Sequence, residues 1–151
     1  MKRWIILAAA AAVVLMSPSR KETDVGELLP VELLYIYKEE SGIWVQTDTG
    51  DLGIGADLQS ALKDLKETAP GKIFLDTADY LIITKETVDL LPQLWGILRP
   101  STEVCLGINA DTQAAAFLSA HKPGVTLNDI RSGGRFLPTL IRTGERYYLV
   151  S

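Results

Sequence analysis

Cysteine and histidine are almost absent from this sequence, which has one residue of each. A single cysteine excludes an internal disulfide framework and a zinc site built from cysteines. A single histidine leaves too few ligands for a histidine-rich metal centre. We therefore expect neither a metal ion nor another cofactor.

Positive charge is also scarce: 15 Lys and Arg residues face 19 Asp and Glu, giving a net charge of −4. Nucleic-acid-binding domains concentrate basic residues, so we expect no nucleic-acid partner. The charge is unevenly distributed. Residues 22–121 carry 6 basic and 17 acidic side chains, whereas residues 122–151 carry 5 basic and 2 acidic ones. The sequence thus predicts an acidic body with a basic C-terminal strip.

The N-terminus holds the one long hydrophobic run. Lys2 and Arg3 precede an uncharged apolar run over residues 4–16, the layout of a secretory signal. The run is shorter than the span of about 20 apolar residues that a bilayer needs, but a thinned membrane accommodates it. We expect residues 1–20 to form an uncleaved signal anchor, with the rest of the chain outside the cytoplasm. Two alternatives are a cleaved signal peptide, which would release the domain, and a buried core helix.

After a polar linker over residues 21–30, the pattern predicts one mixed domain over residues 31–151. Runs of β-branched and aromatic residues alternate with amphipathic, capped segments, and 47% of the chain is hydrophobic. The fold class is α+β or α/β: a single small domain with a mixed β-sheet flanked by three to four helices. The strands are expected at residues 31–37, 43–47, 72–75, 80–83, 103–108, 136–142 and 146–150. The helices are expected after Asp57, over 85–98, from Asp111 to Ala120, and briefly near Thr126, and a glycine-rich loop is expected over 48–55.

Two aspartates have the local context of aspartic proteases. Asp48 lies in Asp48-Thr49-Gly50, and Asp76 lies in Leu75-Asp76-Thr77-Ala78. That chemistry needs two carboxylates about 3 Å apart that share a proton. The two aspartates are too close in sequence for a two-lobed single chain. The alternative enzyme hypothesis is therefore a dimeric, retropepsin-like protease using Asp76 or, less favourably, Asp48.

Aromatic residues suggest contact surfaces instead. Tyr35, Tyr37 and Trp44 lie in the first predicted hairpin, and Tyr147 and Tyr148 lie in the last one. Aromatic side chains are enriched at protein interfaces, and an edge strand can pair with a strand of a partner. A third hypothesis is a small secreted domain that binds an anion at its glycine loop. His121 is expected to cap a helix end, and Cys105 is expected to be a buried hydrophobic residue.

The block over residues 31–123 resembles the first domain of the Ger(x)C family, the C subunit of bacterial spore germinant receptors. The resemblance is carried by a hairpin and glycine-bearing loop, then Ser60-Ala61-Leu62, Lys72-Ile73-Phe74-Leu75, Tyr80-Leu81-Ile82-Ile83, Leu98-Arg99-Pro100 and an alanine-rich helix before Pro123. Arg135-Phe136-Leu137-Pro138 also resembles a family strand that carries a proline. Family members are lipoproteins with two further domains, whereas Cys105 is the one cysteine here and lies in no lipobox. The resemblance implies an exported, membrane-held, non-enzymatic domain of a sporulating bacterium and offers no catalytic residues.

The sequence therefore favours a non-enzymatic binding or assembly module on the outer face of the cell membrane, with a role in sporulation or germination. Its expected partners are the membrane, through residues 4–16, and another membrane or envelope protein. Trp44, Tyr35, Tyr37, Tyr147 and Tyr148 are the candidate binding residues.

Overall fold

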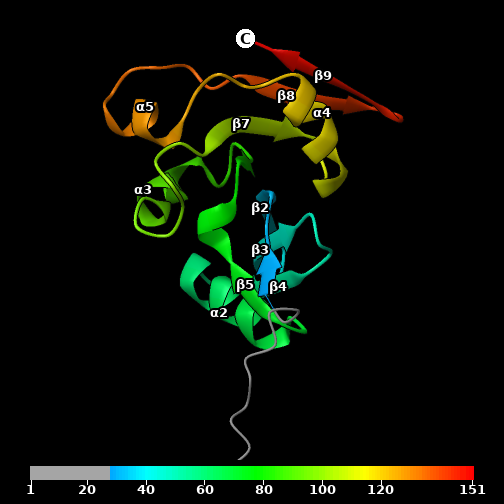
Figure 1. Ribbon diagram of the computed structural model, residues 1–151, viewed down its shortest axis with the longest axis vertical. Coiled ribbons are helices and arrows are strands. Elements are labelled where there is room, and N and C mark those ends of the chain that lie inside the picture. The colour runs from blue at the N-terminus through cyan, green and yellow to red at the C-terminus, as the bar shows by residue number, and fades with distance from the viewer. Residues whose placement is uncertain (1–27) are drawn as a thin grey trace, which may run out of the picture.

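The computed structural model describes residues 28–151, so the predicted anchor over residues 4–16 and most of the predicted linker lie outside the described residues. The described chain forms a seven-stranded mixed sheet with strand order β4-β3-β2-β6-β7-β8-β9, next to a small parallel pair, β1-β5 (Figure 1). Within residues 28–151, four α-helices flank the large sheet. This is the single small mixed-sheet domain predicted from the sequence.

The strand bounds follow the predictions closely in the centre of the sheet. The strands are β1 (Leu28–Pro30), β2 (Leu33–Glu39), β3 (Gly42–Thr47), β4 (Leu52–Gly55), β5 (Lys72–Phe74), β6 (Tyr80–Ile83), β7 (Glu103–Ile108), β8 (Thr139–Thr143) and β9 (Arg146–Val150). The helices are α2 (Leu58–Thr68), α3 (Leu91–Leu94), α4 (Ala115–Ala120) and α5 (Leu127–Arg131).

The centre of the sheet is parallel and its edges are antiparallel. Strands β2, β6, β7 and β8 run parallel, whereas β3 and β4 at one edge and β9 at the other run antiparallel to their neighbours. Parallel strands buried on both faces are continuously hydrophobic. All four residues of β6 are buried, and they alternate between two core clusters.

The two faces of the sheet are covered unequally. The larger core cluster packs α2, α3 and α5 against one face, which we call the helical face. The smaller cluster packs α4 against the opposite face, which we call the open face. Figure 1 shows the same division, with α2, α3 and α5 on one side of the sheet and α4 on the other. On the open face, β3 and β4 contribute no residue to the smaller core cluster, whereas Leu33 and Tyr35 of β2 lie in it with Leu118 of α4.

The predicted glycine loop over residues 48–55 is wrong in its second half, which forms β4. Gly53 is buried, and a Cβ atom there would lie 2.1 Å from the carbonyl oxygen of Ala61 in α2. The glycine is present because α2 packs directly on the strand. It does not mark a loop, and the loop to which the anion-binding hypothesis refers is limited to residues 48–51.

The predicted helix over residues 85–98 is also wrong in its extent. A 3-10 turn over Val88–Leu90 leads into α3, which begins at Leu91, and Pro92 occupies its first turn. Proline fits that position but cannot donate the hydrogen bond that a continuous helix requires. Upstream, the buried hydroxyl of Thr87 accepts from the Thr84 N–H at 2.9 Å and donates to the Ile36 carbonyl at 3.0 Å, which holds the segment in a turn.

One further difference concerns the start of the domain. Leu28–Pro30, at the end of the predicted linker, form strand β1, which pairs in parallel with β5 outside the main sheet. The hydroxyl of Thr77 accepts from the Val31 N–H at 3.0 Å and so fixes the chain as it leaves β1. Within residues 28–151, no helix is long and apolar enough to cross a membrane.

Candidate functional site

Three aromatic side chains form a row on the open face. Tyr35 and Tyr37, two residues apart on β2, stack with ring centroids 4.6 Å apart. Trp44 lies opposite Tyr37 on β3, with centroids 5.8 Å apart, and Ile54 lies opposite Trp44 on β4. The indole N–H of Trp44 donates to the Ser41 hydroxyl at 2.9 Å, which fixes the ring's orientation. We call Tyr35, Tyr37 and Trp44 the aromatic row.

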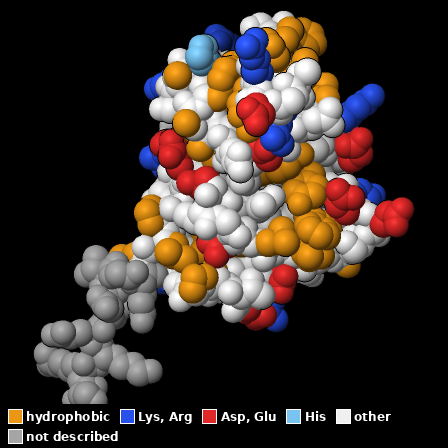
Figure 2. Space-filling view, turned by 90° about the vertical axis from the view of Figure 1, so that its right-hand side faces the viewer, with side chains coloured by type: hydrophobic (Ala, Val, Ile, Leu, Met, Phe, Trp, Pro, Cys, Tyr) orange, Lys and Arg blue, Asp and Glu red, His pale blue; other side chains and the backbone are white. Residues whose placement is uncertain are grey.

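The three side chains of the row differ in burial, from Tyr35 in the core to Trp44 nearer the surface. Tyr35 is only 9% exposed and belongs to the smaller core cluster, so it offers little surface of its own, and its role as a binding residue stays a prediction. Tyr37 is half-buried at the margin of that cluster, and Trp44 is half-buried and belongs to neither cluster. Figure 2, which faces the α4 side of the molecule, shows hydrophobic side chains gathered beside acidic ones. The surface part of the row is therefore Tyr37 and Trp44, with Tyr35 as its buried support.

Carboxylates surround the tyrosines of the row. The pKa of Tyr35 is raised to about 12, mainly by burial and further by the neighbouring Tyr37, Asp111, Glu39 and Glu86. The pKa of Tyr37 is also raised, by burial and then by Glu39. Each of these carboxylates disfavours a second negative charge nearby. The environment of the row is therefore acidic, and both phenols stay protonated at neutral pH.

A polar cluster holds the C-terminal hairpin against the open face. Asp111 accepts from the Gln113 N–H at 3.0 Å and from the Tyr147 hydroxyl, and it pairs with Arg142 at 2.6 Å. The Tyr147 ring lies 5.7 Å from that of Phe117 in α4, centroid to centroid. Burial and the bond to Asp111 raise the pKa of Tyr147 to about 12. Tyr147 therefore packs the hairpin onto α4, and its predicted role on a contact surface is not supported by this geometry.

Tyr148 lies on the opposite, helical face. It is 49% exposed and lies beside Ile141 of β8, which in turn lies beside Ile108 of β7. Ile108 is 50% exposed, and Val150, two residues after Tyr148 on β9, is 51% exposed. We call Ile108, Ile141, Tyr148 and Val150 the outer patch. Sequence reasoning found Tyr148 but missed its neighbours, because which strands pair side by side is not visible in a strand's own pattern.

Both protease candidates have other structural settings. One oxygen of Asp48 accepts from the backbone N–H groups of Glu32 and Leu33, both at 3.0 Å, and so fixes the start of β2. Asp76 is exposed in a 3-10 turn. The neighbouring threonine hydroxyls bond elsewhere: that of Thr49 donates to Asp51, and that of Thr77 contacts the backbone of Val31. In the described chain, neither threonine positions its aspartate for catalysis.

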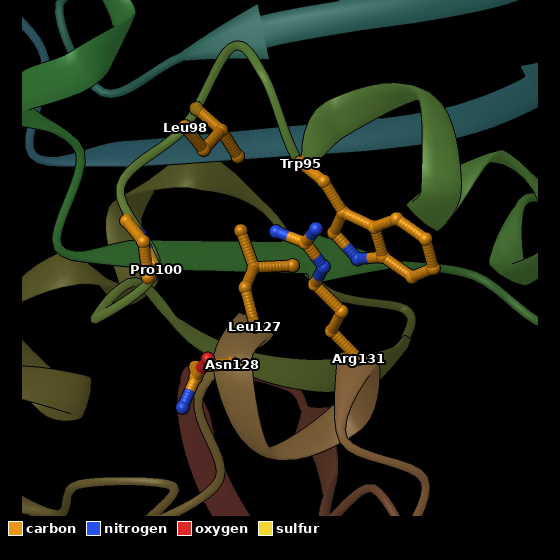
Figure 3. A pocket seen from close by; sticks show the side chains of 6 residues that line it. All are labelled: Trp95, Leu98, Pro100, Leu127, Asn128 and Arg131. Atoms are coloured by element: carbon orange, nitrogen blue, oxygen red, sulfur yellow. The ribbon is translucent and has the colours of Figure 1, made fainter.

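Two hollows of the described surface do not suggest catalysis. Figure 3 shows a hollow of about 20 Å³ between α3 and α5, in which the guanidinium group of Arg131 lies 5.7 Å from the centroid of the Trp95 ring. That volume holds about one water molecule. Its lining residues are Trp95, Leu98, Pro100, Leu127, Asn128 and Arg131.

A larger polar hollow of about 380 Å³ lies where the parallel strands begin. It is lined by side chains of both charges, and two of them, Asp79 and Arg99, pair with each other. Open α/β sheets bind ligands outside the carboxyl ends of their strands, which is the other end. This hollow therefore does not have the position of such a ligand site.

Residues 28–151 offer neither a cluster of metal ligands nor an exposed cysteine. These residues contain no group of three or more potential metal ligands. Cys105 is buried in β7, as predicted, and burial raises the pKa of its thiol to about 12. The thiolate, which is the reactive form, is therefore suppressed.

No family model matches the chain, and no curated protein or solved structure matches it. The function is therefore inferred from the chemistry of the two surfaces, the aromatic row and the outer patch.

Proposed function

We propose that this protein is a non-enzymatic binding or assembly module that recognises another membrane or envelope protein through Tyr37 and Trp44. Residues 4–16 anchor it in the cell membrane with the domain outside the cytoplasm. The alternative location is outside the cell after cleavage of a signal peptide. In either location the described domain supplies the recognition surface.

The half-burial of Trp44 on the open face carries this proposal. Tryptophan and tyrosine are enriched among the residues that dominate interface affinity, since a large rigid ring buries much area at little entropic cost. Trp44 lies outside both core clusters, so the fold does not need its ring. Its indole is nevertheless held in one orientation by Ser41 and Tyr37. A preorganised aromatic side chain without a core role is suited to a contact.

The charge around the row indicates the chemistry of the partner. Glu39 lies close enough to affect both tyrosines, and residues 22–121 carry 17 acidic against 6 basic side chains. Complementary charge favours association and excludes unsuitable partners. The partner segment on the aromatic row is therefore basic, with an apolar side chain that packs against Trp44.

The cellular setting of the proposal comes from the resemblance to the Ger(x)C family. It suggests a sporulating bacterium and a complex in the membrane or the spore envelope. A role in sporulation or germination predicts that the partner is bound in sporulating cells and not in vegetative ones.

Photocrosslinking in living cells tests the proposal. A photoreactive amino acid replaces Trp44 in the full chain, and the same amino acid replaces Gln59, an exposed residue of α2, as the matched control. We expect a crosslinked membrane or envelope protein from the Trp44 position alone, recovered from sporulating cells. Equal labelling from both positions, or no labelling from Trp44, would contradict the proposal.

A further inference from the structure

The two edges of the large sheet differ in whether side chains occupy their outward-pointing backbone groups. At the β4 edge, side chains of α2 occupy backbone groups that point away from the sheet. The Ile54 N–H donates to Asp64 at 2.8 Å, and the Thr68 hydroxyl donates to the Leu52 carbonyl at 3.2 Å. Capped edge groups cannot pair with another strand, which is one way in which proteins avoid edge-to-edge association. The β4 edge is therefore closed.

The β9 edge has no such protection. Thr143 and Arg146 flank a two-residue turn and form the first pair of the β8–β9 hairpin. Pairs in an antiparallel ladder alternate between hydrogen-bonded and free, so Tyr147 and Leu149 direct their N–H and C=O groups away from β8. Within residues 28–151, no side chain caps these groups. Five residues, Arg-Tyr-Tyr-Leu-Val, thus form an open edge without proline or lysine.

The outer patch adjoins this open edge. Ile108, Tyr148 and Val150 are each about half exposed, and with Ile141 they continue across three strands on the helical face. The α2, α3 and α5 helices cover that face over the earlier strands but leave the patch bare. A sheet with parallel strands normally buries both faces. Within the described part of the chain, the sheet therefore has neither a neighbouring strand nor a covering layer at this end.

We propose that β9 is a strand-addition site, at which a partner protein contributes a strand that pairs with β9 and an apolar segment that covers the outer patch. This inference rests on the proposed function of the domain as a binding module and adds a second surface to it. The partner at this site is acidic, because the exposed Arg146 lies on the same face of β9 as Tyr148 and Val150 and has no ion pair within the described residues. This charge is opposite to that of the partner on the aromatic row.

A second copy of the chain fits this site less well. Two β9 strands paired about a two-fold axis would continue the sheet, and both outer patches would then remain exposed on the same side. An acidic partner that supplies a strand and a cover satisfies the backbone groups, the apolar side chains and the charge together.

Amide hydrogen exchange on the full chain, with a synthetic peptide as the probe, tests the inference. The probe is a short peptide of alternating valine and glutamate, and its counterpart has lysine in place of glutamate. We expect the glutamate peptide to slow exchange at the amides of Tyr147 and Leu149 and to bind about ten-fold more tightly than the lysine peptide. Ile54, whose amide Asp64 already caps, serves as the internal reference for the closed edge.

Variants separate this inference from the proposed function. Leu149→Pro removes an outward donor without removing a bond to β8, and Tyr148→Lys places a charge in the outer patch. We expect either change to weaken binding of the glutamate peptide about ten-fold, with Gln59→Lys as the charge-matched control. Should Leu149→Pro fail to fold, Tyr148→Lys still decides the question. Trp44→Ala is expected to leave this binding unchanged.

Three results would overturn the inference. They are protection at β2 and β3 in place of β9, no protection at either place, and concentration-dependent self-association that protects Tyr147 and Leu149 without peptide. None of them bears on crosslinking through Trp44, so the proposed function would stand or fall separately.

Discussion

Replacing Gly53 with alanine should break the contact between α2 and the sheet. A Cβ atom at this position would lie 2.1 Å from the carbonyl oxygen of Ala61 and 2.6 Å from both the backbone nitrogen and the Cβ atom of Leu65. Two of these atoms belong to the helix backbone and cannot turn aside. To reach ordinary van der Waals separation, α2 has to move away from β4 by about 1 Å, and closely packed interiors do not absorb such a shift without cost.

The expected destabilisation is about 3 kcal/mol, the upper part of the range for overpacked cores, because Leu58, Leu62 and Leu65 all withdraw from the sheet with the helix. Gly96→Ala is the matched control, since a Cβ atom there meets nothing within 4 Å. We expect that control to change stability by less than about 1 kcal/mol. Urea unfolding followed by circular dichroism measures both variants. Equal stability of Gly53→Ala and Gly96→Ala would refute the proposed reason for the glycine in β4.

The remaining predictions concern a buried hydroxyl, a phenol and the aromatic row. Thr87→Val keeps the side-chain volume but leaves two buried backbone groups without their partner, so we expect urea unfolding to show a loss of about 2–4 kcal/mol, against little change for the exposed Thr143→Val. The pKa of Tyr147 is raised from 10.0 to about 12, so the folded state holds this proton more tightly than the unfolded state does. This contribution to the unfolding free energy is complete below pH 10 and is lost as the pH rises toward 12. In Asp111→Asn, the phenolate absorbance of Tyr147 should appear at a lower pH, because the bond to Asp111 that raises its pKa is gone. Trp44→Ala should lower the unfolding free energy by less than about 1 kcal/mol, because its ring lies outside both core clusters, and a loss several times larger would show that Trp44 belongs to the core.

The parts of the fold that sequence reasoning predicted are those specified by local chemistry. The side chain of Asp57 accepts from the Ser60 N–H at 2.7 Å and begins α2, as a residue with good capping propensity should. Thr126 and Asp129 form a reciprocal capping box at the start of α5. Strand β7 has the predicted bounds because it is mostly apolar, with Val104, Cys105, Leu106 and Ile108, and is bounded by turn residues.

The parts that were missed depend on contacts between separate elements. Gly53 and Gly55 suggested a loop, but they are in β4 because the helix that follows, α2, packs directly against that strand. Strand β1 is only three residues long, and it exists because β5, more than 40 residues later, pairs with it. Neither partner is encoded in the local pattern.

For the candidate surfaces too, the local pattern predicted the face on which a residue lies but not its burial. Alternation along β2 correctly places Tyr35 and Tyr37 on one face, but it does not tell which of them a neighbouring strand covers. Alternation along β9 places Tyr147 and Tyr148 on opposite faces, so one packs under α4 and the other remains in the outer patch. Burial of a strand residue depends on the layer above it, which is a tertiary property.

The affinity of the partner that crosslinks through Trp44 is the most direct test of the account. The dissociation constant of that partner is measured for the wild-type chain and for Trp44→Ala, after both proteins have been shown to unfold at the same urea concentration. We predict at least a 30-fold weaker affinity for the variant, which corresponds to about 2 kcal/mol for a dominant interface residue. Equal affinity of the two folded proteins would contradict the claim that this domain recognises its partner through the aromatic row.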